Sequence, residues 1–61
     1  MGANTIYYAK IPVVSYKWIE VSAVTSDEVR EEYPNAVEVL HCTDAHERAM
    51  HDRHFYEELY Q

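Results

Sequence analysis

The sequence predicts a small α+β domain, in which a mainly antiparallel sheet of about three strands packs with a short acidic helix and a C-terminal helix. Two observations lead to this prediction. The first third of the chain is rich in β-branched and aromatic residues, which favour strands. The remainder contains two helix-start signals, separated by a short β-branched segment. With 61 residues, the chain has room for a single domain covering residues 1–61.

Two strands are expected in the N-terminal third, at about residues 5–10 and 14–23. Pro12 has no backbone N–H to donate to a ladder, so it should mark an edge, a bulge or the break between the two strands. Side chains alternate between the two faces of a strand. In the second strand, one face is therefore mainly apolar (Lys17, Ile19, Val21, Ala23), and the other is polar with two aromatic residues (Tyr16, Trp18, Glu20, Ser22).

The clearest local signal is a helix N-terminus at Thr25. The Thr25 side chain should accept a hydrogen bond from the backbone N–H of Glu28, while the Glu28 carboxylate reaches back to the Thr25 N–H. Val24 and Val29 have the spacing of a hydrophobic staple. The helix should cover about residues 26–33, because the residue before Pro34 is disfavoured in the α conformation.

This helix should be amphipathic. Val29 and Tyr33, four residues apart, are expected to face the sheet. The opposite, outward side carries four carboxylates (Asp27, Glu28, Glu31, Glu32). Two of them lie in the first turn, where they suit the positive end of the helix dipole.

A third strand is expected over residues 36–42, followed by a C-terminal helix over about residues 44–60. Thr43 and Asp44 should cap that helix, with Asp44 and Glu47 at capping-box spacing. One stripe along the helix contains mostly apolar residues (Ala45, Ala49, Asp52, Tyr56, Leu59). Strand order stays open, since the roughly dozen residues between the second and third strands allow a parallel crossover or antiparallel packing.

Charge and cysteine content restrict the function classes. A formal net charge of −6 and a pI near 4.9 oppose binding to nucleic acid or anionic lipid. The single cysteine, Cys42, cannot form an intramolecular disulfide or supply several thiolates to a zinc ion. Neither a spanning apolar run nor a signal-peptide pattern is present. A cytoplasmic protein is therefore expected.

An enzyme is not expected. Gly2 is the only glycine, so the chain has no glycine-rich phosphate loop. On a strand, His41 and Cys42 would point to opposite faces and could not form an activated thiolate pair. No catalytic residue and no cofactor is therefore assigned.

Four histidines between residues 41 and 54 suggest a metal site. On one continuous helix, His51 and His54 would lie one turn apart, with Glu47 and Glu58 on the same side. A solvated helical face of mixed charge is the preferred interpretation, and no metal ligand is assigned. A histidine-rich metal-binding domain ranks third among the functions considered.

The carboxylates form the more distinctive pattern. Glu20 projects from the second strand, directly before the helix that carries the other four acidic side chains. Together they are expected to form a negative ridge beside an apolar patch. Such a surface is ordinarily solubilising. The alternative is DNA mimicry, in which carboxylates occupy the phosphate sites of a DNA-binding enzyme.

Residues 20–35 and Val39–Cys42 resemble the phage-encoded uracil-DNA glycosylase inhibitors. In that family a strand carrying Glu-Ser-Ile continues into a short helix of pattern Glu-Glu-Val-x-Glu, and then into a strand containing Leu-Val-His. The resemblance covers roughly residues 18–43. Its identical positions are Glu20, Glu28, Val29, Glu31 and Asn35.

The resemblance implies a protein inhibitor that blocks the DNA-binding cleft of the host glycosylase, or of another DNA-binding enzyme, in the host-cell cytoplasm. Its acidic edge would comprise Glu20, Val21, Ser22, Asp27, Glu28 and Glu31. An apolar pocket would sequester the leucine that the enzyme inserts into DNA, and it would be lined by Val24, Val29, Tyr33 and Val39.

The chain also departs from the family. Val21 and Ser22 stand where the family has Ser and Ile, and the longer N-terminal helix is missing. A helix is expected at the C-terminus, where the family continues with strands. The second interpretation is an acidic adaptor or homodimerising module that binds proteins through exposed aromatic residues (Tyr7, Tyr8, Tyr16, Trp18).

Overall fold

The computed structural model describes residues 4–60 and confirms the α+β fold class. Its strands are β1 (Thr5–Pro12), β2 (Tyr16–Ala23) and β3 (Glu38–His41). Its helices are α1 (Ser26–Glu32), α2 (Cys42–His51) and α3 (Arg53–Leu59). The strands form one sheet in the order β2-β1-β3, and both strand pairs are antiparallel. β2 and β3 do not pair with each other: both are antiparallel to β1, so they run parallel on either side of it, and α1 lies in the connection between them.

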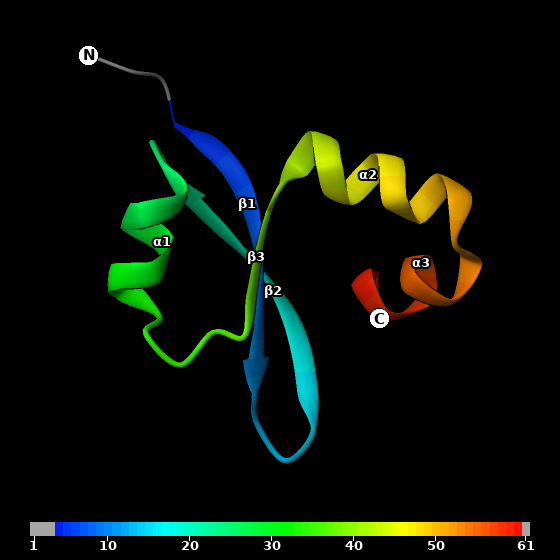
Figure 1. Ribbon diagram of the computed structural model, residues 1–61, viewed down its shortest axis with the longest axis horizontal. Helices are drawn as coiled ribbons and strands as arrows, with labels where there is room; N and C mark the ends of the chain where they lie inside the picture. The colour runs from blue at the N-terminus through cyan, green and yellow to red at the C-terminus, as the bar shows by residue number, and fades with distance from the viewer. Residues whose placement is uncertain (1–3, 61) are drawn as a thin grey trace.

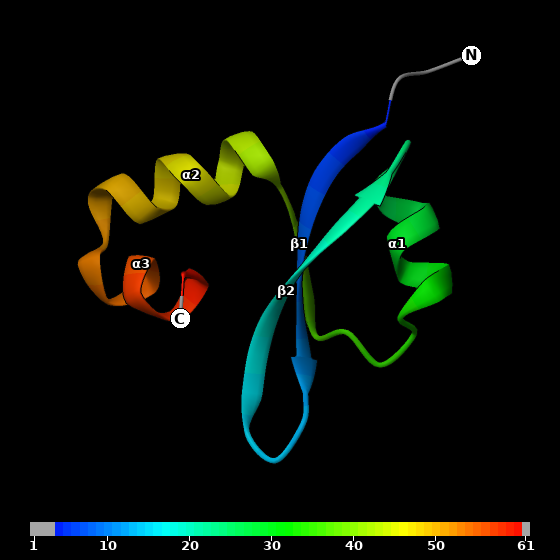
Figure 2. The same ribbon diagram turned by 180° about the vertical axis from the view of Figure 1, so that it is seen from behind.

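The sheet separates two helical layers. Figures 1 and 2 show α1 on one side of the sheet and α2 with α3 on the other. The α1 side contains one core cluster (Tyr7, Ala9, Val21, Ala23, Val29). The α2/α3 side contains the second (Trp18, Ala45, Ala49, Phe55, Leu59). Both faces of β1 and β2 therefore contribute to a core, as the alternation along these strands requires.

β1 and β2 form a hairpin that projects beyond the helices in Figure 1. Pro12 lies at the end of β1, opposite Tyr16. Its missing N–H therefore removes at most the last bond of the ladder. The second strand begins at Tyr16, later than the predicted residue 14, because residues 13–15 form the turn.

The predicted start of α1 is confirmed. The backbone N–H of Glu28 donates to Thr25 Oγ1 at 3.3 Å. The Glu28 carboxylate accepts from the N–H of Val24 at 3.4 Å, one residue before the predicted donor. At the other end, the N–H of Tyr33 donates to the carbonyl of Val29 at 2.9 Å, and Pro34 follows.

The start of α2 differs from the prediction. Strand β3 ends at His41, and the helix begins at Cys42. The ring of His41 caps the helix, because its Nδ1 accepts from the backbone N–H of Thr43 at 3.1 Å. Thr43 and Asp44 therefore lie within the helix and do not cap it. A histidine in this capping role has no sequence signature of the Ser, Thr, Asp and Asn type.

The prediction of one C-terminal helix over about residues 44–60 is wrong. The chain leaves the helical conformation at Asp52, whose backbone is extended with φ −136° and ψ 100°. Asp52 closes α2 and also caps α3, since its side chain accepts from the backbone N–H of Phe55 at 3.2 Å. Aspartate is a poor residue for a helix interior and a good one for this position. In the region that the structure covers, no helix is long and apolar enough to span a bilayer.

Candidate functional site

The outer side of α1 is an acidic surface. Its four carboxylate side chains are all exposed (Asp27, Glu28, Glu31, Glu32). Val29 on the inner side is fully buried and fixes the orientation of the helix against the sheet. Arg30 is the only basic residue of α1. Within residues 4–60 the ion pair present is Arg48–Glu38, so the α1 carboxylates have no salt-bridge partner there.

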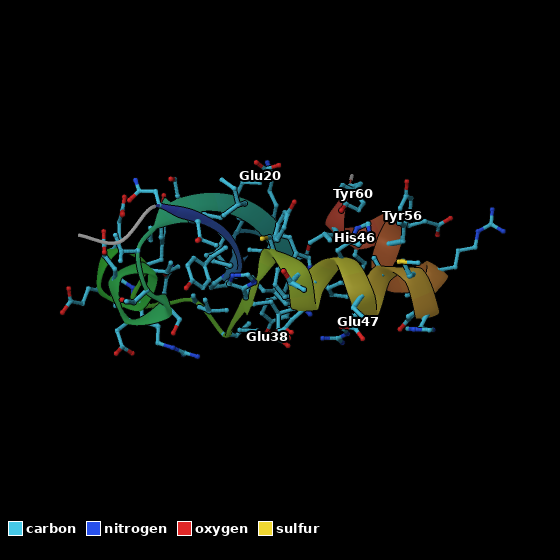
Figure 3. The ribbon with its side chains drawn as sticks, turned by 90° about the horizontal axis from the view of Figure 1, so that it is seen from above. Glu20, Glu38, His46, Glu47, Tyr56 and Tyr60 are labelled. Carbon is cyan, nitrogen blue, oxygen red and sulfur yellow. The ribbon has the colours of Figure 1, made fainter. Side chains whose placement is uncertain are left out.

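Glu20 does not belong to this acidic face. In the β1–β2 ladder it pairs with Tyr8, and it alternates with Val21, which packs in the core beneath α1. Glu20 therefore lies on the α2/α3 face. Figure 3 shows it at the edge of the sheet, on the opposite side of the molecule from Glu38 and well away from α1. The predicted continuous ridge from Glu20 to the helix is wrong, because α1 covers the face to which Glu20 does not point.

The other residues of the predicted acidic edge are split in the same way. Val21 is buried in the core and is not accessible to a partner. Ser22 is exposed, but it shares the face of Glu20. Asp27, Glu28 and Glu31 remain together on α1. Only the helical half of the predicted edge is therefore one surface.

The predicted apolar pocket is part of the core. Val29 is fully buried, and the half-buried side chains of Tyr33 and Val39 pack against its cluster. Val24 lies outside this group and is 41% exposed. The same contacts that anchor α1 therefore fill the space that a leucine would need.

An open hollow of about 450 Å³ lies instead at the hairpin turn, lined by residues 13–17. Val14 at this turn is fully exposed, and the Tyr16 side chain is 60% exposed. Lys10 Nζ lies 5.2 Å from the centroid of the Tyr16 ring. This surface was not predicted, because the β-branched residues around Val14 favour a strand, whereas residues 13–15 form the turn. Pro12 and Ser15 on either side of the two valines were the turn signal that could have found it.

The charge is unevenly distributed along the chain. Residues 1–19 include two lysines and no acidic residue, whereas all eleven Asp and Glu side chains follow from residue 20 onward. Two lysines and one carboxylate (Glu20) give the hairpin a net charge of 2 − 1 = +1, whereas the helices are acidic. The four aromatic side chains of the predicted interface do not lie on one exposed surface. Tyr7 and Trp18 are buried in the two cores, and Tyr8 is half-buried. Of the four proposed aromatics, Tyr16 alone is exposed.

The expected separation of His41 and Cys42 on a strand is also wrong, since the helix begins between them. Cys42 Sγ lies 3.9 Å from His41 Nδ1. That nitrogen already accepts from the N–H of Thr43 at 3.1 Å, so its lone pair is engaged in the helix cap. The pair is therefore part of the α2 N-terminus, and nothing in this contact points to catalysis.

The break at Asp52 places His51 and His54 on different helices, which removes the spacing on which the metal hypothesis depended. Across residues 4–60, no three His, Cys, Asp or Glu side chains are grouped so that they could hold a metal ion. No protein-family model matches the chain, and neither does any curated protein or solved structure. A functional assignment therefore depends on the surface itself.

Proposed function

We propose that the protein is a non-catalytic inhibitor that binds the DNA-binding cleft of a DNA-repair enzyme, with uracil-DNA glycosylase as the specific target. The α1 carboxylates would occupy positions that the enzyme uses for DNA phosphates. The observation that carries this proposal is the outer face of α1, where four exposed carboxylates lie within two helical turns and lack an ion-pair partner in the described chain.

The position of the helix supports this role. Carboxylates three or four residues apart on a helix have Cβ atoms about 5–6 Å apart, which gives a dense row of negative charge. The Thr25 cap and the buried Val29 hold that row in place before any partner arrives. A preorganised charged surface needs less ordering on binding than a flexible acidic tail. Complementary potential also speeds association with a positively charged cleft.

The proposed inhibitory surface contains fewer residues than the sequence resemblance implies. Glu20 and Ser22 lie on the other face of the sheet, and Val21 is buried, so they are not assigned to the inhibitory surface. Sequestration of a leucine is also left out, because Val29 is in the core. The proposed contact is electrostatic, and it should therefore weaken as salt is added.

The test uses purified glycosylase, a uracil-containing oligonucleotide and an excess of the protein. Uracil excision should fall, and it should recover when Glu28 and Glu31 are both replaced by Gln. Glutamine keeps a side-chain oxygen that can accept the N–H of Val24, so the helix cap is retained. Undiminished excision with the wild-type protein in excess would exclude the glycosylase as the target.

The matched control is the replacement of Glu57 and Glu58 by Gln. Both side chains are exposed on α3, and the change in net charge is the same. This variant should inhibit as the wild type does. Equal weakening by the two pairs would show that net charge, and not the α1 face, is responsible, and would contradict the proposal.

A second candidate function is an acidic protein-binding adaptor, and one observation favours it. The hairpin turn exposes Val13, Val14 and Tyr16 together, an apolar surface that monomeric domains usually avoid. A partner bound through this turn should be lost when Val13 and Val14 are both replaced by Ser, whereas glycosylase binding should not change. Retention of the glycosylase on immobilised wild-type and variant protein distinguishes the two functions.

A further inference from the structure

Strand β2 presents a free edge. It is an outer strand of the sheet, eight residues long and without proline. Figure 2 shows it in front of the sheet, with the helices on either side and none across it. No segment within residues 4–60 pairs with its outer side. The other edge strand, β3, has four residues and leads directly into α2. An edge of this length is a ready template for another strand.

We propose that two copies of the chain pair antiparallel through β2, which joins the two three-stranded sheets into one. The two-fold axis is then perpendicular to the sheet, so residues that face each other lie on the same side of it. If at least seven of the eight β2 residues are to pair with the second copy, the two-fold axis must pass at Ile19 or at Glu20. An axis at Glu20 would oppose two carboxylates, which is destabilising. The pairing is therefore centred on Ile19.

This register is complementary in charge. It places Glu20 opposite Trp18 of the second copy. Trp18 pairs with Lys10 in its own hairpin, and Lys10 Nζ lies 5.9 Å from the centroid of a Trp18 ring. Glu20 and Lys10 each lack a salt bridge within their own chain in residues 4–60. Glu20 of one copy and Lys10 of the other therefore lie in the same cross-strand row, with Trp18 between them. The two-fold symmetry repeats this arrangement, so it occurs twice in the dimer.

The same register covers apolar surface. Ser22 lies opposite Tyr16 of the second copy, and Ser22 pairs with Ile6 in its own hairpin. The Tyr16 and Ile6 side chains are 60% and 38% exposed in the single chain. Tyr16 of one copy and Ile6 of the other therefore lie in the same cross-strand row, on either side of the small Ser22 side chain. On the other face, Ile19 meets its own copy, which makes the α1-side cores continuous.

The net charge of −6 on each chain opposes association, but it is not concentrated at this edge. Along β2 itself, Lys17 and Glu20 balance each other. β1, the strand next to it, carries Lys10 and no carboxylate. The remaining ten acidic residues follow β2 in the sequence. At physiological ionic strength their repulsion is screened over about 8 Å.

Sedimentation equilibrium over a range of protein concentrations tests the dimer. The wild type should shift from 7.2 kDa toward twice that mass as concentration rises. Glu20→Lys should weaken dimerisation about tenfold, because two attractive pairs become repulsive. Adding Lys10→Glu should restore it. Glu31→Lys on α1 makes the same charge change away from the edge and should leave dimerisation unchanged or slightly stronger.

A cross-link tests the register without relying on charge. In a Cys42→Ser background, Ile19→Cys should form a disulfide-linked dimer on oxidation, since facing residues have Cα atoms about 4.5–5.5 Å apart. Ser22→Cys, three residues from the axis, should not. A single 7.2 kDa species at every concentration would overturn the proposal. A dimer that is indifferent to Glu20→Lys and does not cross-link at residue 19 would also overturn it.

Discussion

Asp52 and Phe55 together determine how the C-terminal third of the chain folds. Asp52 Oδ1 accepts a hydrogen bond from the backbone N–H of Phe55 at 3.2 Å, which starts α3 directly after α2 ends. The resulting turn brings the Phe55 ring against Trp18 of the sheet, with ring centroids 5.4 Å apart and planes at 78°. On one continuous helix, Ala45 and Phe55 would lie about 15 Å apart along the axis. The turn at Asp52 folds α3 back, so both side chains belong to one core cluster.

The first prediction concerns this cap. Asp52→Ala should lower the free energy of unfolding by about 1 kcal/mol, because the first turn of α3 loses its side-chain acceptor. Asp52→Asn keeps an acceptor oxygen, so it should lower the free energy of unfolding by less than about half as much as Asp52→Ala. Urea unfolding followed by far-UV circular dichroism measures both. Equal losses for the two variants would show that the charge, and not the cap, matters.

The sequence was sufficient for the fold class and for α1, because those depend on local signals. Strand propensity located the hairpin, and the Thr25 cap with Pro34 bounded the helix. The break at Asp52 was missed because Asp52 falls on the same helical stripe as Ala45 and Ala49, so the periodicity continues through it. A shared cap between two helices becomes clear only when Phe55 is seen to contact Trp18.

The candidate site was predictable only in part, for a related reason. Alternation correctly assigned Glu20 and Val21 to opposite faces of β2. It could not determine which face α1 would cover. That choice depends on the packing of Val29 against Val21 and Ala23, a contact between separate elements. Glu20, three residues before the end of β2, is therefore close to α1 in the sequence but lies away from its acidic face.

The second prediction concerns Arg48. Its Nη1 lies 3.1 Å from Glu38 Oε2, and its guanidinium carbon lies 4.3 Å from the centroid of the Phe55 ring. Arg48→Ala should cost about 1 kcal/mol, because the ring contact and the exposed ion pair each contribute a fraction of that. Glu38→Gln removes only the ion pair and should cost less than about 0.5 kcal/mol.

Salt separates these two contributions of Arg48. Unfolding in 1 M sodium chloride should abolish the small effect of Glu38→Gln, because the pair is half-exposed and screened. The greater part of the Arg48→Ala effect should persist, since it comes from packing on Phe55. If Glu38→Gln were as destabilising as Arg48→Ala at both salt concentrations, the ring contact would contribute nothing.

The third prediction concerns the buried indole of Trp18. Its Nε1 has no hydrogen-bond partner among residues 4–60, and the side chain is 8% exposed. An unsatisfied buried donor costs about 1–3 kcal/mol, so Trp18→Phe should remain within about 1 kcal/mol of the wild type despite its smaller ring. Trp18→Ala should lose about 3–5 kcal/mol. Chemical denaturation compares the two, and a loss as large for Phe as for Ala would contradict this interpretation.

The proposed dimer and the proposed inhibitory surface are geometrically compatible. Because the two-fold axis is perpendicular to the sheet, the two copies turn the same face in the same direction. Both α1 helices therefore lie on the same side of the joined sheet. The dimer would then present two acidic helices to one partner and gain from multivalent contact. Because Glu20 belongs to the β2 edge and not to the acidic face, Glu20→Lys separates dimerisation from inhibition by the single chain.

The fourth prediction concerns stability at alkaline pH. Burial raises the pKa of the Tyr8 hydroxyl above its ordinary value of 10.0, and Tyr60 and the charge of Glu20 add to the effect. The folded state therefore holds this proton more tightly than the unfolded state does. The stability from this difference is present in full below pH 10 and is lost as the pH rises through the raised pKa. Between pH 9 and pH 12, Tyr8→Phe should lose less stability than the wild type, and Glu20→Gln should fall between them. Parallel pH profiles for all three proteins would contradict this assignment.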